Sequence, residues 1–201
     1  MGFLTDYQIP YVEYKGRSYK INVAYDSILN IQRMYKEEQE LDGAEKLDIA
    51  VGILIDSGKP ERLTYAEKCE LLELIYREHV NVKERPKVGK QKKVLDFEED
   101  GEYIYASFMQ DYGIDLIEQQ GKLAWKKFIA LFQGLSEKTK IKEVMKIRGM
   151  DIPSPNKHNQ KEIKQITELK MYYALPSEGM NGEKGLDLLF STLERMVEKS
   201  G

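Results

Sequence analysis

The stretch that most strongly indicates a helical fold is KLAWKKFIALFQGL, residues 122–135. Its large apolar residues recur at i, i+3, i+4 and i+7, the spacing that places side chains on one face of an α-helix. These residues are Trp125, Phe128, Ile129 and Phe132. Gly134 is expected to end the helix, because glycine is common at helix C-termini. The sequence therefore predicts a helix with an aromatic face at this position.

The segment DFEEDGEYIYASFMQDYGIDL, residues 96–116, places five carboxylates in its first seven residues. Counted from Asp96, positions 1, 3 and 5 are acidic as in an EF-hand calcium loop, but position 12 is Ser107 instead of a bidentate glutamate. A helix start explains the same residues, with Asp96 as the N-cap and Glu99 completing a capping box. We favour the helix start and expect no metal site.

The N-terminal part of the chain has the pattern of a β-hairpin. Apolar and polar residues alternate in YVEYKGRSYKINVAY, residues 11–25, on both sides of Lys15 and Gly16. A lone hairpin is only marginally stable, so its apolar face is expected to rest on other elements.

Helices are expected from Asp26 onward. Asp26 is a candidate N-cap for a first helix, whose apolar period runs through Ile28, Ile31 and Tyr35. A second, short helix is expected to end near residues 57–58. A third is expected to start with a capping box formed by Thr64 and Glu67.

A basic segment separates the two halves of the sequence. Residues 83–93 carry six basic side chains and one acidic one, together with Pro86 and Gly89. They form either a phosphate-contacting patch or a solvated linker, and we favour the linker because no aromatic residue is interleaved to stack on a base. The predicted organisation is an N-terminal hairpin and helices in residues 1–82, this linker, and a helical region in residues 94–201.

The last segment, residues 185–199, has the cleanest amphipathic pattern in the sequence. Its apolar stripe consists of Leu186, Leu189, Phe190, Leu193, Met196 and Val197. The predicted fold class is therefore mainly α, an N-terminal β-hairpin followed by a multi-helix bundle.

Composition excludes several classes of function. The 201 residues are 41% hydrophobic and 32% charged with a net charge of −3, which gives no reason to expect nucleic acid or an anionic membrane as partner. No stretch approaches the roughly 20 apolar residues that span a bilayer. The single cysteine, Cys69, suits a reducing cytoplasm. Because His79 and His158 are the only histidines and no phosphate-binding loop or nucleophile motif occurs, we expect no catalytic residue, no cofactor and no enzyme.

The chain is instead rich in contact groups. Thirteen tyrosines and eight methionines provide amphipathic and adaptable side chains for protein partners. The competing interpretation is that most of them are core or half-buried residues.

Residues 96–116, followed by LAWKKFIALFQGLSEKTKIKEVMKIRGMDIP (residues 123–153), resemble the bacteriophage proteins encoded between the major tail protein and the tape measure protein of long-tailed phages. That family is regarded as tail assembly chaperones. The match is good over residues 94–153 and weaker over the hairpin. The chain has Ala124 and Lys126 where the family's helix motif, Leu-His-Trp-Trp-Lys-Phe, has histidine and the second tryptophan.

The resemblance implies a non-enzymatic chaperone that binds the tape measure protein in the host cytoplasm during tail morphogenesis. The alternative is a structural tail-tip or connector component retained in the virion. A further copy of this chain is a second candidate partner. The candidate partner-binding residues are aromatic: Tyr103, Tyr112, Trp125, Phe128 and Phe132. The competing interpretation places the last three in the core.

Overall fold

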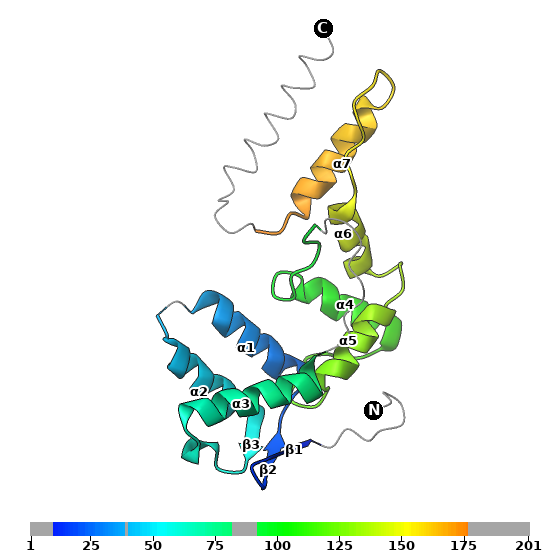
Figure 1. Ribbon diagram of the computed structural model, residues 1–201. Coiled ribbons are helices and arrows are strands. Elements are labelled where there is room, and N and C mark those ends of the chain that lie inside the picture. Colours follow the sequence, from blue (N-terminus) through cyan, green and yellow to red (C-terminus); the bar gives the residue numbers. More distant parts are fainter. Residues whose placement is uncertain (1–9, 39, 82–91, 177–201) are drawn as a thin grey trace. The chain divides into compact units, whose positions relative to one another are not determined.

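The computed structural model describes residues 10–38, 40–81 and 92–176 (Figure 1). A β-hairpin comes first, and the described residues that follow contain seven α-helices and a third strand that joins the hairpin in one antiparallel sheet. The predicted fold class is therefore confirmed. Residues 83–91 of the predicted linker and the predicted helix at 185–199 lie outside the described residues, so the domain boundaries stay a prediction.

The chain forms two compact units that each combine separate segments. The first unit consists of Met1–Pro86 and Tyr112–Leu135, and the second of Lys87–Asp111 and Ser136–Gly201. The segment around the aromatic helix thus packs with the N-terminal half of the sequence.

The predicted hairpin is present in the first unit. Strands β1 (Tyr11–Tyr14) and β2 (Arg17–Ile21) pair antiparallel, with Val12 opposite Tyr19. Lys15 and Gly16 have positive φ angles of 48° and 72°, as a two-residue type I′ turn requires. Val12 and Tyr19 are buried, so the apolar face rests on the unit as expected.

A third strand was not predicted. Helix α2 (Gly43–Leu54) ends before residues 57–58, and β3 (Ile55–Ser57) continues from it to pair with β2. The Leu54 carbonyl accepts a hydrogen bond from the Asn22 amide at 2.8 Å. This pairing with the hairpin ends the helix early, and the local sequence does not indicate it.

Helix α3 (Tyr65–Ile75) starts with the predicted capping box and ends in one π-helical turn, Tyr76–Val80. The Glu67 carboxylate accepts a hydrogen bond from the Thr64 amide at 2.8 Å, and Thr64 Oγ1 accepts one from the Glu67 amide at 3.4 Å. The Thr64 backbone and the Lys15 ammonium lower the pKa of Glu67 to about 2. A second capping box, formed by Asp42 and Glu45 at the start of α2, was not predicted.

The N-cap of helix α1 (Tyr25–Glu37) lies two residues earlier than predicted. Ala24, not Asp26, is its N-cap residue. Ala24 forms an antiparallel bridge with Ala124, and Asp26 Oδ1 accepts a hydrogen bond from the Gly121 amide at 2.9 Å. Asp26 therefore binds a distant loop instead of capping its own helix.

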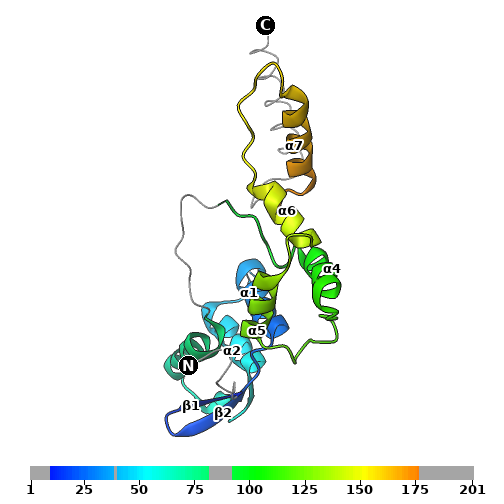
Figure 2. The same ribbon diagram turned by 90° about the vertical axis from the view of Figure 1, so that its right-hand side faces the viewer.

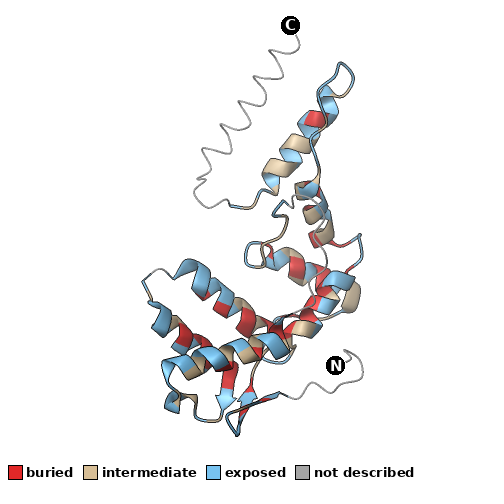
Figure 3. Cartoon of the chain, viewed as in Figure 1, coloured by how far each residue is buried: buried red, intermediate tan, exposed pale blue. Residues whose placement is uncertain are grey.

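The aromatic helix α5 (Trp125–Gly134) completes the core of the first unit by lying beside α1 (Figures 1 and 2). The Phe128 side chain is 1% exposed and stacks on Tyr25 with ring centroids 4.8 Å apart. Buried residues form continuous stripes along both helices (Figure 3). The predicted helix and its buried apolar face are confirmed.

The second unit contains α4 (Gly101–Tyr112, apart from its last residue), α6 (Lys140–Gly149) and α7 (Gln160–Tyr172). Its buried apolar residues include Ile104, Phe108, Ile141, Val144, Ile147 and Ile163. Ser107 Oγ accepts a hydrogen bond from the Ile141 amide at 3.1 Å and donates one to the Tyr103 carbonyl at 2.6 Å. This buried hydroxyl joins α4 to the start of α6.

The acidic segment is a helix start, with one correction. Asp96 Oδ1 accepts hydrogen bonds from the Glu98 and Glu99 amides at 3.1 and 3.4 Å, as an N-cap does. The helix itself begins at Gly101. The carboxylate that accepts from the Asp96 amide is Asp100, at 3.0 Å, and not the predicted Glu99.

Candidate partner-binding surface

Three of the five predicted partner-binding residues are core residues of the first unit. Trp125, Phe128 and Phe132 are all buried, and the Phe128 ring lies 5.7 Å from the Trp125 ring and 6.4 Å from the Phe132 ring. These residues form a core face, as the competing interpretation predicted. A buried ring reaches a partner only if the unit opens. Their role in partner binding stays a prediction.

The two predicted tyrosines belong to different units. Tyr112, in the first unit, is half-buried and donates a hydrogen bond to the Leu131 carbonyl at 2.9 Å, which ties the end of α4 to α5. Tyr103, in the second unit, is half-buried and packs edge-on against Tyr173 at 6.1 Å. Both tyrosines therefore make contacts within their own unit. Tyr103 belongs to a different unit from the other four predicted residues.

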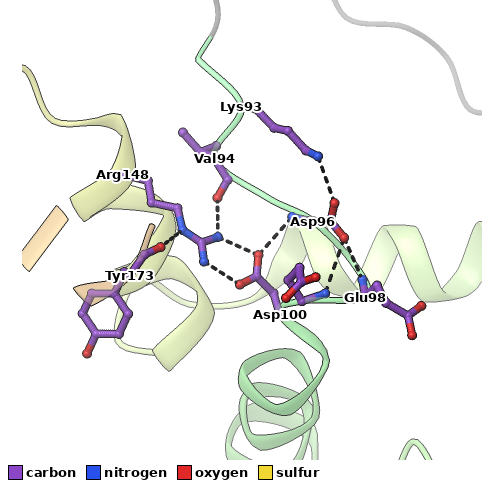
Figure 4. Close-up of polar contacts among 8 residues, drawn as sticks. Lys93, Val94, Asp96, Glu98, Asp100, Arg148 and Tyr173 are labelled. Atoms are coloured by element: carbon purple, nitrogen blue, oxygen red, sulfur yellow. Dashed lines mark hydrogen bonds and ion pairs between the residues drawn. The ribbon is translucent and has the colours of Figure 1, made fainter. Parts of the chain in front are cut away.

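The second unit contains a buried ion pair that the sequence analysis did not identify. The Arg148 guanidinium donates to both carboxylate oxygens of Asp100, at 2.6 and 2.8 Å (Figure 4). The Asp100 side chain is 0% exposed and the Arg148 side chain 8%. Arg148 also donates to the carbonyls of Val94, at 3.0 Å, and Tyr173, at 2.5 Å. One side chain thus joins the start of α4, helix α6 and the end of α7.

Lys170 of α7, which is half-buried, makes a second polar contact in the same unit. Its ammonium donates to three carbonyls at the end of α6, those of Ile147, Arg148 and Met150, at 3.1, 2.6 and 2.8 Å. Burial lowers the pKa of Lys170. The contact satisfies carbonyls that a helix C-terminus leaves without partners, and places a positive charge at the negative end of the helix dipole. Both polar contacts join elements within the second unit.

Exposed tyrosines instead lie on the first unit. Tyr35 of α1 is 48% exposed and Tyr65 of α3 is 58% exposed. Cys69 is exposed one turn along α3 and lies close to both rings. It raises the pKa of Tyr65. Burial raises the pKa of Tyr35, with a smaller contribution from Cys69. We call Tyr35, Tyr65 and Cys69 the tyrosine surface.

Tyr35 is exposed, although it was predicted to lie on the apolar stripe of its helix. The helical period had placed Tyr35 on the apolar stripe with Ile28 and Ile31, but Met34 takes the buried position at the next turn. Either residue continues a 3.6-residue period, so the sequence pattern alone does not decide between them.

Charged groups lie around the tyrosine surface. The Lys46 ammonium lies over the Tyr35 ring at 5.8 Å from its centroid. The connection from α1 to α2, residues 38–42, carries three exposed carboxylates, Glu38, Glu40 and Asp42, and its sequence has no basic residue. Asp42 acts electrostatically on Tyr65, so the acidic connection borders the surface. Aromatic rings beside carboxylates are suited to contact lysine and arginine side chains as well as apolar ones.

Within residues 10–38, 40–81 and 92–176, no three His, Cys, Asp or Glu side chains are grouped so that they could hold a metal ion. None of the helices described has both the length and the apolar character needed to cross a bilayer.

The chain matches the model of a known protein family. The family model described as Bacteriophage Gp15 protein matches residues 4–175. No curated protein and no solved structure matches the chain significantly.

Proposed function

Because the chain belongs to the bacteriophage Gp15 protein family, we propose that it is a non-enzymatic tail assembly chaperone that binds the tape measure protein during tail morphogenesis in the host cytoplasm. Membership of a phage family is consistent with this role. The link to the tape measure protein rests on the sequence resemblance of residues 94–153 to tail assembly chaperones.

The observation that carries the proposal is the tyrosine surface. Tyr35 and Tyr65 offer two large amphipathic rings on neighbouring parts of α1 and α3, next to the acidic connection between α1 and α2. Tyrosine supplies contact area at low entropic cost. An amphipathic helix with a basic flank would place apolar side chains against the rings and lysine or arginine near the carboxylates.

A chaperone of this kind needs contacts that are specific but reversible. Before the tail tube polymerises around it, a long helical protein exposes apolar stripes, which promote aggregation until they are covered. A surface of two tyrosines is small, which favours weak binding at each site and easy release when the tube polymerises. Several copies along one long helix would increase the total affinity without a stronger single contact.

The test is co-expression of the full-length protein with the tape measure protein of the same phage. We expect the tape measure protein to co-purify and to stay soluble. The double variant Tyr35→Ala/Tyr65→Ala should lose at least tenfold in binding while it keeps its melting temperature. Tyr11→Ala, which removes a tyrosine of β1 that is 46% exposed, is the matched control and should bind normally.

Two results would contradict the proposal. In the first, the tape measure protein neither co-purifies nor gains solubility with the wild-type protein. In the second, the protein is found at a fixed copy number in finished particles, which would support the alternative of a structural tail-tip or connector component.

A further inference from the structure

Helix α7 buries only one side. Ile163 is 0% exposed and packs toward α6, as does the Lys170 side chain. Leu169 and Tyr172, three residues apart, are 44% and 77% exposed. Their spacing places them on one face of α7, and we call them the outer face. A helix with a second apolar face of this kind needs something to cover it.

The sequence that follows α7 has the pattern required to cover the outer face. Residues 185–199 carry six apolar side chains at helical spacing, and the segment between them and α7 contains Gly179 and Gly182. The eight residues 177–184 reach up to about 26 Å when extended. Packed helix axes lie about 8 to 10 Å apart, so this connection is long enough for an antiparallel return.

The charges also match in an antiparallel arrangement. If Leu189 lies opposite Leu169, the acidic residues Glu194 and Glu198 come beside the first half of α7. That half presents the exposed residues Lys161 and Lys164. In the described part of the chain, Lys164 has only a long contact of 3.9 Å with Glu168, an exposed pair of the kind that contributes little to stability. The tail would bring two further carboxylates to this basic half.

We propose that residues 185–199 form an amphipathic helix that docks antiparallel on the outer face of α7 in the same chain. The docked helix covers Leu169 and Tyr172 with its apolar stripe and places Glu194 and Glu198 beside Lys161 and Lys164. The chain's own tail then covers the outer face, so a partner uses a different surface. The tail of a second copy, or a helix of another protein, are the other occupants that the experiment must distinguish.

Disulfide trapping in the full-length protein tests the proposal. Cys69 is replaced by serine, which leaves no other cysteine. One variant then carries Leu169→Cys and Leu189→Cys, on the outer face and the apolar stripe. The control carries Leu169→Cys and Ser191→Cys. Ser191 is two residues further along, at about 100° per residue, and so lies on the opposite side of the predicted helix. Mild oxidation is followed on non-reducing gels over a hundredfold range of protein concentration.

We expect the Leu169/Leu189 variant to form a disulfide within one chain, at a rate independent of protein concentration and at least tenfold faster than the control. Equal rates for the two variants would overturn the proposal, because an undocked tail reaches both positions alike. Disulfide-linked dimers that form faster at higher concentration would overturn it in favour of a second copy.

A second measurement avoids new cysteines. In the full-length wild-type protein, amide hydrogen exchange in residues 185–199 should be at least tenfold slower than expected for an unstructured chain. The variant Leu169→Asp should lose most of this protection, whereas Met109→Asp, at an apolar residue of α4 that is 43% exposed, should keep most of it. Exchange at the unstructured rate in the wild-type protein would contradict docking.

Discussion

The two units hold their helices together in different ways. In the first unit, α5 is held against α1 by apolar contact, with the Phe128 ring stacked on Tyr25 and flanked by Trp125 and Phe132. In the second unit, apolar contacts are joined by charged groups, the buried Asp100–Arg148 pair and the half-buried Lys170. Apolar burial supplies most of the driving force in both units, but it is not directional. The charged groups add a fixed register between segments, because their hydrogen bonds require particular geometry.

The largest effect is expected from the aromatic core. Phe128→Ala removes the ring at the centre of the stack and leaves a cavity, which should cost about 4 kcal/mol of unfolding free energy. Denaturant unfolding of the full-length protein measures this loss. Tyr11→Ala on the exposed side of β1 is the control and should change stability little. An unchanged midpoint for Phe128→Ala would mean that α5 is not held by its aromatic face.

The buried ion pair should respond differently to single and double substitution. Asp100→Asn leaves the Arg148 charge buried, and should cost about 3 kcal/mol, at the lower end for a broken buried pair because two carbonyls still accept from Arg148. The double variant Asp100→Leu/Arg148→Met removes both charges and should recover part of that loss. A double variant as unstable as the sum of the two single variants would show that the pair does not act as a unit.

The Lys170 contact should matter less than the ion pair. Lys170→Met keeps the aliphatic stem and removes the charge that caps α6, which should cost about 2 kcal/mol. Lys164→Met changes an exposed lysine of the same helix and serves as the control. If the two variants melt at the same temperature, the three carbonyls of α6 do not depend on Lys170.

The smallest effect concerns pH and the first unit. Burial lowers the pKa of His79, with a smaller opposing contribution from Glu78 and a lowering one from Lys126. The unfolded chain therefore binds a proton near pH 6.5 while the folded protein does not, so stability should fall as the pH decreases below about 6.5. His79→Gln should remove this part of the pH dependence, and His158→Gln, at an exposed site, should not. Identical profiles for His79→Gln and the wild-type protein would exclude His79 as the cause.

Features encoded by neighbouring residues could be predicted from the sequence, whereas contacts between distant segments could not. The face of α5, the Lys15-Gly16 turn and the Thr64–Glu67 capping box were predicted because each is encoded within a few neighbouring residues. Strand β3 and the Asp26–Gly121 contact were missed because they depend on segments distant in the sequence. Asp100 was read as one carboxylate among five at a helix start, and nothing near it indicates Arg148 as its partner.

The candidate site was harder to predict than the fold. Hydrophobic periodicity selects aromatic residues that pack inward, such as Phe128. The exposed Tyr35 and Tyr65 lie beside the buried stripes of their helices, where a pattern gives no signal. Their proximity depends on how α1 and α3 pack.

The most direct test of the partner surface is amide hydrogen exchange of the full-length protein with and without the tape measure protein. We expect slower exchange on binding in Tyr25–Glu37 and Tyr65–Ile75, which carry Tyr35 and Tyr65, and little change in Gln160–Tyr172. Protection confined to Gln160–Tyr172, with no change in the first unit, would contradict it.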